Sequence, residues 1–270
     1  MAVTADDEEF AAFERRGWAR RSATYHDGFG AMTAGLHEAL LDAAAVGAGI
    51  RLLEVGCGTG RLAARALARG ARVVATDADR RMAGAAAAAL PGALVRTARL
   101  PGLPFAGAEF DAAIGAFVIN HVPDPPAAVA DLGRVLRPGG RLVLSCWDTA
   151  ERNRAQGVFF DAVAEAGAAR PPGVPAGSPF ARYAGPEALA GLLRAAGLAE
   201  VRVERAGWTH RVDADRWWQD VLDGTVLTAA LIEGRPPQEV ERIRAAYGRL
   251  AARYRDGFPA AALVAVGTRV

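Results

Sequence analysis

The stretch Leu52 to Gly60, LLEVGCGTG, decides the fold. The apolar run from Ile50 to Val55 predicts a buried parallel strand. The run breaks at Gly56-Cys57-Gly58-Thr59-Gly60, and a helical pattern follows from Leu62 to Leu67. A strand, a glycine-rich turn and a helix form one arm of a nucleotide-binding βαβ unit. The glycines allow a tight turn and a close approach of the ligand, and the helix presents its free N–H groups to that ligand.

The spacing of the glycines indicates which ligand is bound. In a dinucleotide fingerprint, G-x-G-x-x-G, the third glycine would fall on Arg61. The spacing is instead E-x-G-x-G-x-G, with Glu54 two residues before Gly56. It resembles the first motif of class I S-adenosylmethionine (SAM) methyltransferases, in their small-molecule, methyltransferase type 11-like branch. The resemblance implies that the turn wraps the amino-acid end of SAM, whose ammonium favours a nearby acid. The alternative is a turn that only reverses the direction of the chain.

Several enzyme classes are excluded by residues that the chain lacks. The 270 residues include no lysine, and Schiff-base chemistry, pyridoxal-phosphate attachment and a Walker A loop each require a lysine amine. None of the three serines sits in G-x-S-x-G, so an α/β-hydrolase elbow is absent. The four histidines have no metal-ligand spacing, and we expect no metal site.

The composition indicates a globular protein that binds neither nucleic acid nor membranes. Hydrophobic residues make up 51 % of the chain, enough for a sizeable core. The net charge is only +2 and no basic cluster is present, and no apolar run is long enough to span a membrane. Cys57 and Cys146 are expected to be free thiols in a reducing compartment, and the acidic start MAVTADDEEF does not resemble a signal peptide. We therefore expect a soluble, cytoplasmic protein, and its oligomeric state stays open.

An acid follows the second predicted strand, Ala71 to Thr76, at Asp77. Rossmann-like folds use an acid at this place to bind ribose, because a carboxylate accepts from two vicinal hydroxyls at once. Asp79 is expected to be the N-cap of the next helix. Met82 lies one turn into that helix, where it packs either on adenine or in the core.

The third predicted strand, Ala93 to Ala98, leads to a departure from the family pattern. The family usually has an acid a few residues before a Leu-Pro-Phe, and that acid accepts from the adenine amino group. Leu103-Pro104-Phe105 match, but Arg99 holds the place of the acid, and arginine only donates hydrogen bonds. Adenine is then held by backbone groups, by stacking of the guanidinium, or by nothing specific.

The fourth predicted strand, Phe110 to Ala116, leads to Asn120-His121-Val122-Pro123-Asp124, which resembles the family segment that faces the acceptor. Ligands collect at the carboxyl ends of strands in an open α/β sheet, so Phe117 and His121 are expected to face the cleft. His121 is either a base or a wall residue hydrogen-bonded to backbone. RPGG before the fifth strand, Arg141 to Cys146, is a further resemblance.

The N-terminal pattern of Trp18, Ala23 and Tyr25 resembles a segment that folds over the cofactor in many of these enzymes, although both aromatic residues also suit a helix anchored on the core. Together the resemblances imply one set of residues at SAM. They are Tyr25, Glu54, Gly56, Cys57, Gly58, Gly60, Asp77, Ala78, Met82, Arg99, Leu100, Ala116, Phe117 and His121.

The predicted fold is α/β, a Rossmann-like, doubly wound, mostly parallel sheet of seven strands with an antiparallel last strand and a helical lid. Two long segments interrupt the family pattern after the fifth and sixth strands, so both leave from the carboxyl edge of the sheet, above the active site. The expected division is a helical cap (1–48), the SAM-binding core (49–148), an insertion (149–183), more core (184–207), a helical lid insertion (208–259) and the last strand (260–270).

Aromatic residues in the two insertions suggest an apolar or aromatic acceptor, although ordinary packing of lid helices is the alternative for each of them. The candidate acceptor contacts are Phe159, Tyr183, His210, Trp217 and Trp218. Because neighbours on a helix point about 100° apart, only one of the two adjacent tryptophans is expected to face the pocket.

The resemblance implies a SAM-dependent methyltransferase that passes a methyl group to an oxygen, nitrogen or carbon nucleophile of a small molecule, such as a natural-product intermediate, and leaves S-adenosylhomocysteine. The protein contributes positioning and exclusion of water. A base is needed only for a protonated nucleophile, and the candidates are His121, then His26, then His210. Two alternatives stay open. One is a cyclase or isomerase that keeps SAM as a prop or has lost it, which Arg99 favours, and the other is a non-catalytic binding protein.

Overall fold

The chain folds around one seven-stranded sheet, and the computed structural model describes residues 4–270. The strand order is β3-β2-β1-β4-β5-β7-β6. Neighbouring strands are parallel except that β7 runs antiparallel to β5 and β6. The strands are β1 (Arg51–Val55), β2 (Arg72–Asp77), β3 (Leu94–Thr97), β4 (Phe110–Ala116), β5 (Leu136–Trp147), β6 (Leu198–His210) and β7 (Phe258–Arg269). This order confirms the predicted Rossmann-like sheet with its antiparallel last strand.

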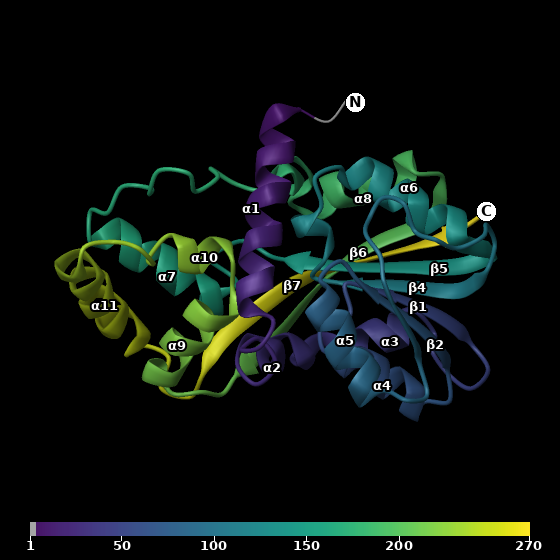
Figure 1. The fold of residues 1–270 in the computed structure, drawn as a ribbon, viewed down its shortest axis with the longest axis horizontal. Coiled ribbons are helices and arrows are strands. Elements are labelled where there is room, and N and C mark those ends of the chain that lie inside the picture. The colour runs from purple at the N-terminus through teal and green to yellow at the C-terminus, as the bar shows by residue number, and fades with distance from the viewer. Residues whose placement is uncertain (1–3) are drawn as a thin grey trace.

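Helices cover both faces of the sheet (Figure 1). Leu52 and Leu53, which are adjacent on β1, belong to two different clusters of buried apolar side chains, because successive side chains point to opposite faces of a strand. Burial on both faces explains the continuous apolar run of β1. One face carries α3 (His37–Ala43), α4 (Arg61–Ala68) and α5 (Arg80–Ala89), and the other carries α6 (Pro125–Val135) and α8 (Pro186–Ala195).

Side-chain caps begin two of these helices just beyond the carboxyl ends of their strands. Asp79 accepts hydrogen bonds from the N–H groups of Arg81 and Met82 at the start of α5, which confirms it as the N-cap. Asp124 accepts from the N–H of Ala127, with Pro125 at the first position of α6. Local sequence signals therefore fix where the chain turns at the edge that holds the site.

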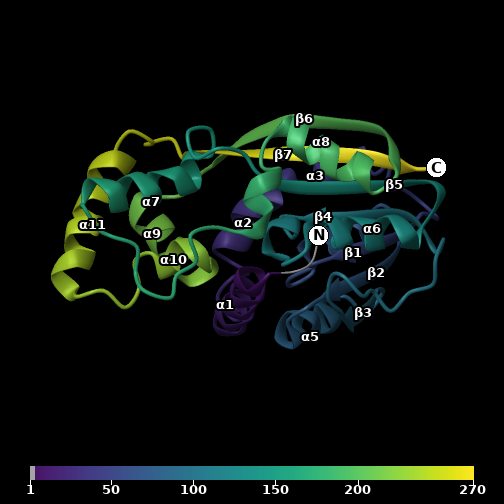
Figure 2. The ribbon, with the colours of Figure 1, turned by 90° about the horizontal axis from the view of Figure 1, so that it is seen from above.

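A second group of helices, which we call the lid, lies beside the sheet (Figures 1 and 2). It comprises α7 (Arg154–Glu165), α9 (Ala214–Gly224), α10 (Leu227–Ala230) and α11 (Pro237–Ala251). β6 and β7 extend from the sheet into the lid, where Phe258 and Ala260 of β7 join its apolar cluster. Within residues 4–270, no helix combines the length and the apolar character needed to cross a membrane.

The N-terminal helix α1 (Ala5–Arg21) runs between the lid and the carboxyl edge of the sheet (Figure 1). Arg21 at its end pairs with Glu233 beside α10 at 2.6 Å, and Arg81 of α5 donates to the carbonyl of Ala19 at 2.9 Å. The helix therefore contacts both halves of the molecule. The short helices α2 (Phe29–Thr33) and η1 (Ala34–Leu36, 3-10) connect it to α3.

Several element bounds predicted from the sequence differ from the structure, among them those of the fifth strand, since β5 begins at Leu136 and not at Arg141. The sequence pattern predicts a helix from Asp6 to Tyr25, but α1 ends at Arg21. The pattern predicts a second helix from Gly30 to Ala45, which the structure divides into α2, η1 and α3. Glycine within that stretch weakens a continuous helix. The sequence pattern predicts the sixth strand from Ala199 to Arg205, but β6 continues to His210, because its pairing with β7 extends as far as Phe258.

Candidate active site

The glycine turn between β1 and α4 has a backbone that only glycine adopts easily. Gly56, Gly58 and Gly60 have φ angles of 64°, 54° and 87°, in the left-handed region that side chains disfavour. A Cβ on Gly56 would lie 2.5 Å from Val118, and one on Gly60 would lie 2.5 Å from Leu90. The turn is therefore closed on two sides, and its open side faces the pocket described below.

Asp77, at the end of β2, fastens the middle of this turn. Its carboxylate accepts from the N–H of Gly58 at 2.8 Å and from the N–H of Asp79 at 2.8 Å. Burial raises the pKa of Asp77 to about 6, although both hydrogen bonds favour the ionised form. Each carboxylate oxygen has a second lone pair, so the side chain keeps the capacity to accept from a ligand.

A pocket lies on the open side of the turn and has about 370 Å³ of empty space including its mouth, at the lower end of the range for small-molecule sites. It brings together seven of the residues that the sequence assigns to SAM, Tyr25, Glu54, Gly56, Cys57, Gly58, Ala116 and Phe117. Sequence reasoning missed the other lining residues, Gly30, Thr33, His37, Thr59, Arg61 and Leu62.

Three polar atoms of the pocket wall have no hydrogen-bond partner within residues 4–270. They are Glu54 Oε2, His37 Nδ1 and Arg61 Nε. Glu54 is 2 % exposed, and burial, together with the charge of Asp77, raises its pKa to about 8. Burial, with the positive charges of Arg65 and Arg61, lowers the pKa of His37 to about 4. Unpaired buried polar groups are costly, and here acidic and basic ones line the same pocket, as a zwitterionic ligand requires.

Phe117 forms the wall at the end of β4 in a strained conformation. Its φ angle is +54°, which is rare for a bulky residue and typically persists at functional sites. Its N–H donates to the carbonyl and to the hydroxyl of Ser145, and its ring stacks on Trp147 at 3.9 Å between centroids. These contacts from β5 hold the aromatic ring over the cleft.

His121 lies beyond this pocket, in the 3-10 turn η2 (Ile119–His121), and does not line it. Its Nδ1 is 2.7 Å from a carboxylate oxygen of Glu14, on α1. The second candidate base, His26, contacts the hydroxyl of Thr59 through Nδ1 at 2.5 Å, so it lies beside the glycine turn. The third, His210, packs against Trp217 in the lid, and burial lowers its pKa.

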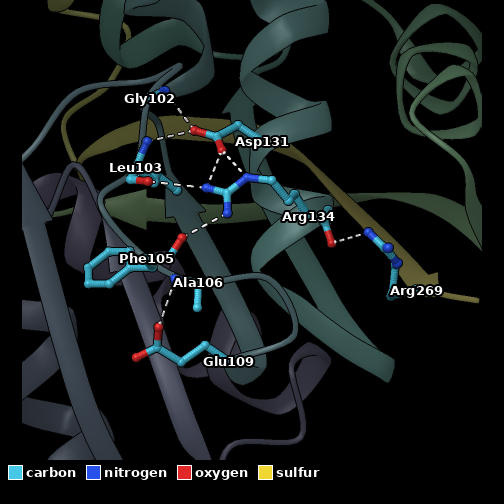
Figure 3. A network of polar contacts seen from close by, with 9 residues as sticks. Gly102, Leu103, Phe105, Ala106, Glu109, Asp131, Arg134 and Arg269 are labelled. Carbon is cyan, nitrogen blue, oxygen red and sulfur yellow. Dashed lines mark hydrogen bonds and ion pairs between the residues drawn. The ribbon is translucent and has the colours of Figure 1, made fainter.

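The segment after β3, where the sequence predicts the adenine contacts, contains an exposed arginine and a loop with a defined position. Arg99 is exposed, Met82 is buried in the core, and Ala78 is exposed. The following loop is held by α6, as Figure 3 shows. Asp131 accepts from the N–H groups of Gly102 and Leu103. Arg134 donates to the carbonyls of Leu103 and Phe105, so the Leu-Pro-Phe segment has a defined position without any contact from Arg99 to this network.

The lid residues expected at the acceptor are mostly placed elsewhere. Phe159 and Trp217 are 0 % exposed and Trp218 is 7 % exposed, all within the apolar core of the lid. The expectation that one tryptophan faces the pocket is therefore not met, and the ordinary-packing alternative describes both. Tyr183 is half-buried in the 3-10 helix η3 (Pro179–Tyr183), which contacts η2.

Comparison with known proteins places the chain in a family. Residues 53–144, which run from β1 into β5, match the model of a methyltransferase domain. The demethylmenaquinone methyltransferase of Mycobacterium sp. (strain KMS) is 31 % identical over 194 residues, which cover 72 % of this chain and 79 % of that protein. The chain belongs to the class I SAM-dependent methyltransferases.

Other relatives of this chain share shorter stretches or only the fold. An uncharacterized protein of Mycobacterium bovis is 35 % identical over 146 residues, 53 % of each chain, so this chain spans about half the length of that relative. The solved structure of the [4+2]-cyclase SpnF superposes with a TM-score of 0.56 at 22 % identity, covering 88 % of this chain and 81 % of that chain. That likeness shows a shared fold.

The part of the chain that matches the family model contains Glu54, the glycine turn, Asp77 and His121. The helix α1, the pocket residues Thr33 and His37, and the lid helices lie outside it. No sequence signal marks Thr33 or His37, since they reach the pocket only through the packing of α2 and α3 against the turn.

Proposed function

We propose that this methyltransferase binds SAM beside the glycine turn and transfers its methyl group to an oxygen, nitrogen or carbon nucleophile of a small acceptor. One observation carries the proposal: Glu54 Oε2, His37 Nδ1 and Arg61 Nε are unpaired and line the same pocket. The amino-acid end of SAM has an ammonium that needs an acceptor and a carboxylate that needs donors. The residues present therefore fit the cofactor.

The roles of the residues follow from their chemistry. Glu54 would accept from the ammonium, and Arg61 with His37 would donate to the carboxylate. Asp77 would accept from the ribose hydroxyls through the lone pairs that Gly58 and Asp79 leave free. These assignments use an ionised Glu54, which the positive charge of the ligand favours by lowering its pKa.

Bound SAM supplies an electrophilic methyl group on a sulfonium sulfur. The residues of this chain position the cofactor, exclude water and orient the acceptor. Tyr25 and Phe117 both line the pocket, and Phe117 is 7 % exposed while Tyr25 is half-buried. The fixed loop held by Asp131 and Arg134 supports the adenine side.

The acceptor we propose is a small apolar or aromatic molecule, such as a natural-product intermediate. A continuous aromatic group beside the pocket supports this class. Phe117 stacks on Trp147, and Trp147 lies 6.1 Å from Trp208 between ring centroids. Both tryptophans are partly exposed, which leaves aromatic surface for a ligand.

A methyltransferase fold that no longer methylates is the second candidate. Arg99 favours it, because an arginine stands where the family has an acceptor for the adenine amino group. The neighbouring fold of SpnF belongs to a protein described as a [4+2]-cyclase. Such a protein would bind SAM, or a remnant of its site, without consuming it.

Calorimetry with SAM tests the binding site, and mass spectrometry tests the reaction. We expect wild-type protein to bind SAM and Glu54→Gln to bind it at least tenfold more weakly. Glu38→Gln is the control, because Glu38 is an exposed acid on the neighbouring helix α3. A gain of one methyl group by a phenol, amine or heteroaromatic probe supports transfer. Absence of SAM binding to the wild type contradicts the proposed function.

A further inference from the structure

A buried carboxylate on α1 lies against the histidine at the end of β4. Glu14 is 5 % exposed, and one oxygen, Oε2, lies 2.7 Å from His121 Nδ1 and 2.9 Å from Trp18 Nε1. The edge of Trp18 packs on the imidazole, with 5.3 Å between centroids and planes at 86°. Asn120 Nδ2 lies 2.9 Å from His121 Nε2. The imidazole is therefore held at both nitrogens and against one tryptophan.

Hydrogen-bond chemistry assigns the protons of this group. The indole N–H of Trp18 only donates, so Glu14 accepts from it, and His121 Nδ1 donates to the same oxygen. His121 Nε2 then carries the lone pair of the neutral ring and accepts from the amide of Asn120. The hydrogen bond at one imidazole nitrogen fixes the tautomer and so the role of the other. A carboxylate behind Nδ1 is the arrangement that orients a histidine for proton removal at Nε2.

The contact between Asn120 and Nε2 is one that a ligand can replace. Asn120 Oδ1 is buried without a hydrogen-bond partner within residues 4–270, so the amide is only half satisfied. The imidazole of His121 is 29 % exposed, so part of the ring is accessible to a ligand. A hydroxyl that reaches Nε2 donates a hydrogen bond in place of the amide.

We propose that Glu14 is a positioning residue for His121 and that His121 removes the proton from a hydroxyl group of the acceptor. This inference rests on the proposed function, and it narrows the acceptor to a hydroxyl compound. A neutral amine already presents a free lone pair, whereas a hydroxyl becomes a good nucleophile only as its proton leaves. Proton removal by the Glu14–His121 pair therefore assists a hydroxyl acceptor and gives no help to a neutral amine.

The hydroxyl oxygen attacks the methyl carbon as its proton passes to His121 Nε2. The C–O bond forms, the C–S bond breaks, and the electron pair of that bond stays on sulfur in S-adenosylhomocysteine. The imidazolium that forms is stabilised by the carboxylate of Glu14 at Nδ1, and it returns the proton to solvent after the methylated product leaves.

The tautomer of His121 is a direct readout of Glu14 that requires no acceptor. The protein is labelled with ¹⁵N-histidine, and the four ring systems are resolved at alkaline pH by long-range ¹H–¹⁵N correlation, with His121→Gln identifying the signal. We expect Nδ1–H and a bare Nε2 in the wild type. Glu14→Ala should move most of the population to Nε2–H, and Glu9→Ala, at an exposed position of the same helix, should not.

Kinetics with simple probes test the acceptor class. Methyl transfer from SAM is measured to a panel of phenols and to the matching anilines. We expect methylation of phenols, and a fall in kcat of about 100-fold or more in His121→Gln. Glu14→Ala and the shape-conserving Glu14→Gln should also lower kcat, with little change in KM, while Glu9→Ala keeps the wild-type rate.

Calorimetry with SAM on each variant distinguishes a failure of the proposed SAM site from a failure of the proposed proton transfer to His121. If the wild-type protein does not bind SAM, the proposed function is contradicted. If the wild type binds SAM normally, any one of three results would overturn the role of the Glu14–His121 pair. They are an Nε2–H tautomer in the wild type, a tautomer that Glu14→Ala leaves unchanged, and methylation of anilines but not of phenols.

Discussion

The carboxylate of Asp77 accepts a hydrogen bond from the backbone N–H of Gly58 at 2.8 Å. This bond joins the end of β2 to the centre of the glycine turn that follows β1. Because Gly58 has a positive φ angle, its N–H points away from the regular ladder and toward the neighbouring strand end. The acid that the sequence assigns to ribose therefore also shapes the turn that holds the other end of the ligand.

Replacement of Asp77 by Ala should weaken SAM binding by at least ~1.5 kcal/mol, about tenfold, because it removes charge-assisted hydrogen bonds. Calorimetry measures the affinity, and circular dichroism confirms that the variant folds. Asp79→Ala is the control, since Asp79 caps α5 and its loss should cost about 1 kcal/mol of stability with little effect on SAM. An unchanged affinity in folded Asp77→Ala would refute the assignment.

SAM binding at pH 7 should release close to one proton. The pKa of Glu54 is about 8 in the free protein, so its carboxyl is mostly protonated, whereas an α-amino group is still largely charged. The ammonium lowers the pKa of Glu54 on binding and drives the proton off. Calorimetry in buffers of different ionisation enthalpy counts the protons. We expect almost no proton release on SAM binding to Glu54→Gln. Equal proton release by both proteins would show that Glu54 does not contact the ammonium of SAM.

The same carboxyl should make stability depend on pH. Its folded pKa lies above the usual 4.5, so the folded protein binds more protons between these values, and stability falls as pH rises through about 8. Thermal unfolding from pH 5 to pH 9 should show a steeper decline for the wild type than for Glu54→Gln. Parallel curves would mean that the buried carboxyl does not titrate as described.

Arg99→Asp separates two explanations of the departure from the family pattern. If the site has adapted to the guanidinium, for example by stacking on adenine, the change should weaken SAM binding. We expect this outcome because the remaining motifs are intact. Arg96→Asp makes the same charge change at another exposed position nearby and should leave the affinity unaltered. Tighter binding by Arg99→Asp would show an unadapted site instead.

Trp217→Ala should act on stability and not on the cofactor. The indole is fully buried, stacks on Phe29 and donates to the carbonyl of Ala155 at 2.7 Å. We expect a loss of about 3–5 kcal/mol and a fall in melting temperature of roughly 10 °C. SAM affinity should stay the same. Trp147→Ala is the contrasting variant, because its partly exposed ring beside Phe117 should raise the KM of the acceptor. Identical effects of both variants on kinetics would contradict this division.

The sequence predicts those parts of the site that are local in the chain. The apolar run, the turn and the helix after it are adjacent, and Asp79 caps a helix within three residues, so pattern and spacing suffice. The contact between Glu14 and His121 joins positions 107 residues apart, and no periodicity encodes it. The lid tryptophans show a second limit, because an apolar helix face looks the same whether it covers a pocket or a core.

The helix that carries Glu14 is attached to the rest of the molecule by ion pairs such as Arg21–Glu233 and Glu14–His121. Among residues 4–270, no side chain of α1 belongs to any of the three apolar clusters, whereas the lid is continuous with the sheet through β6 and β7. Ligand entry is therefore expected to require movement of α1 rather than of the lid. When α1 leaves, His121 loses the carboxylate at Nδ1. The proposed proton acceptor would then be complete only while α1 is in place, since Glu14 supplies the contact at Nδ1.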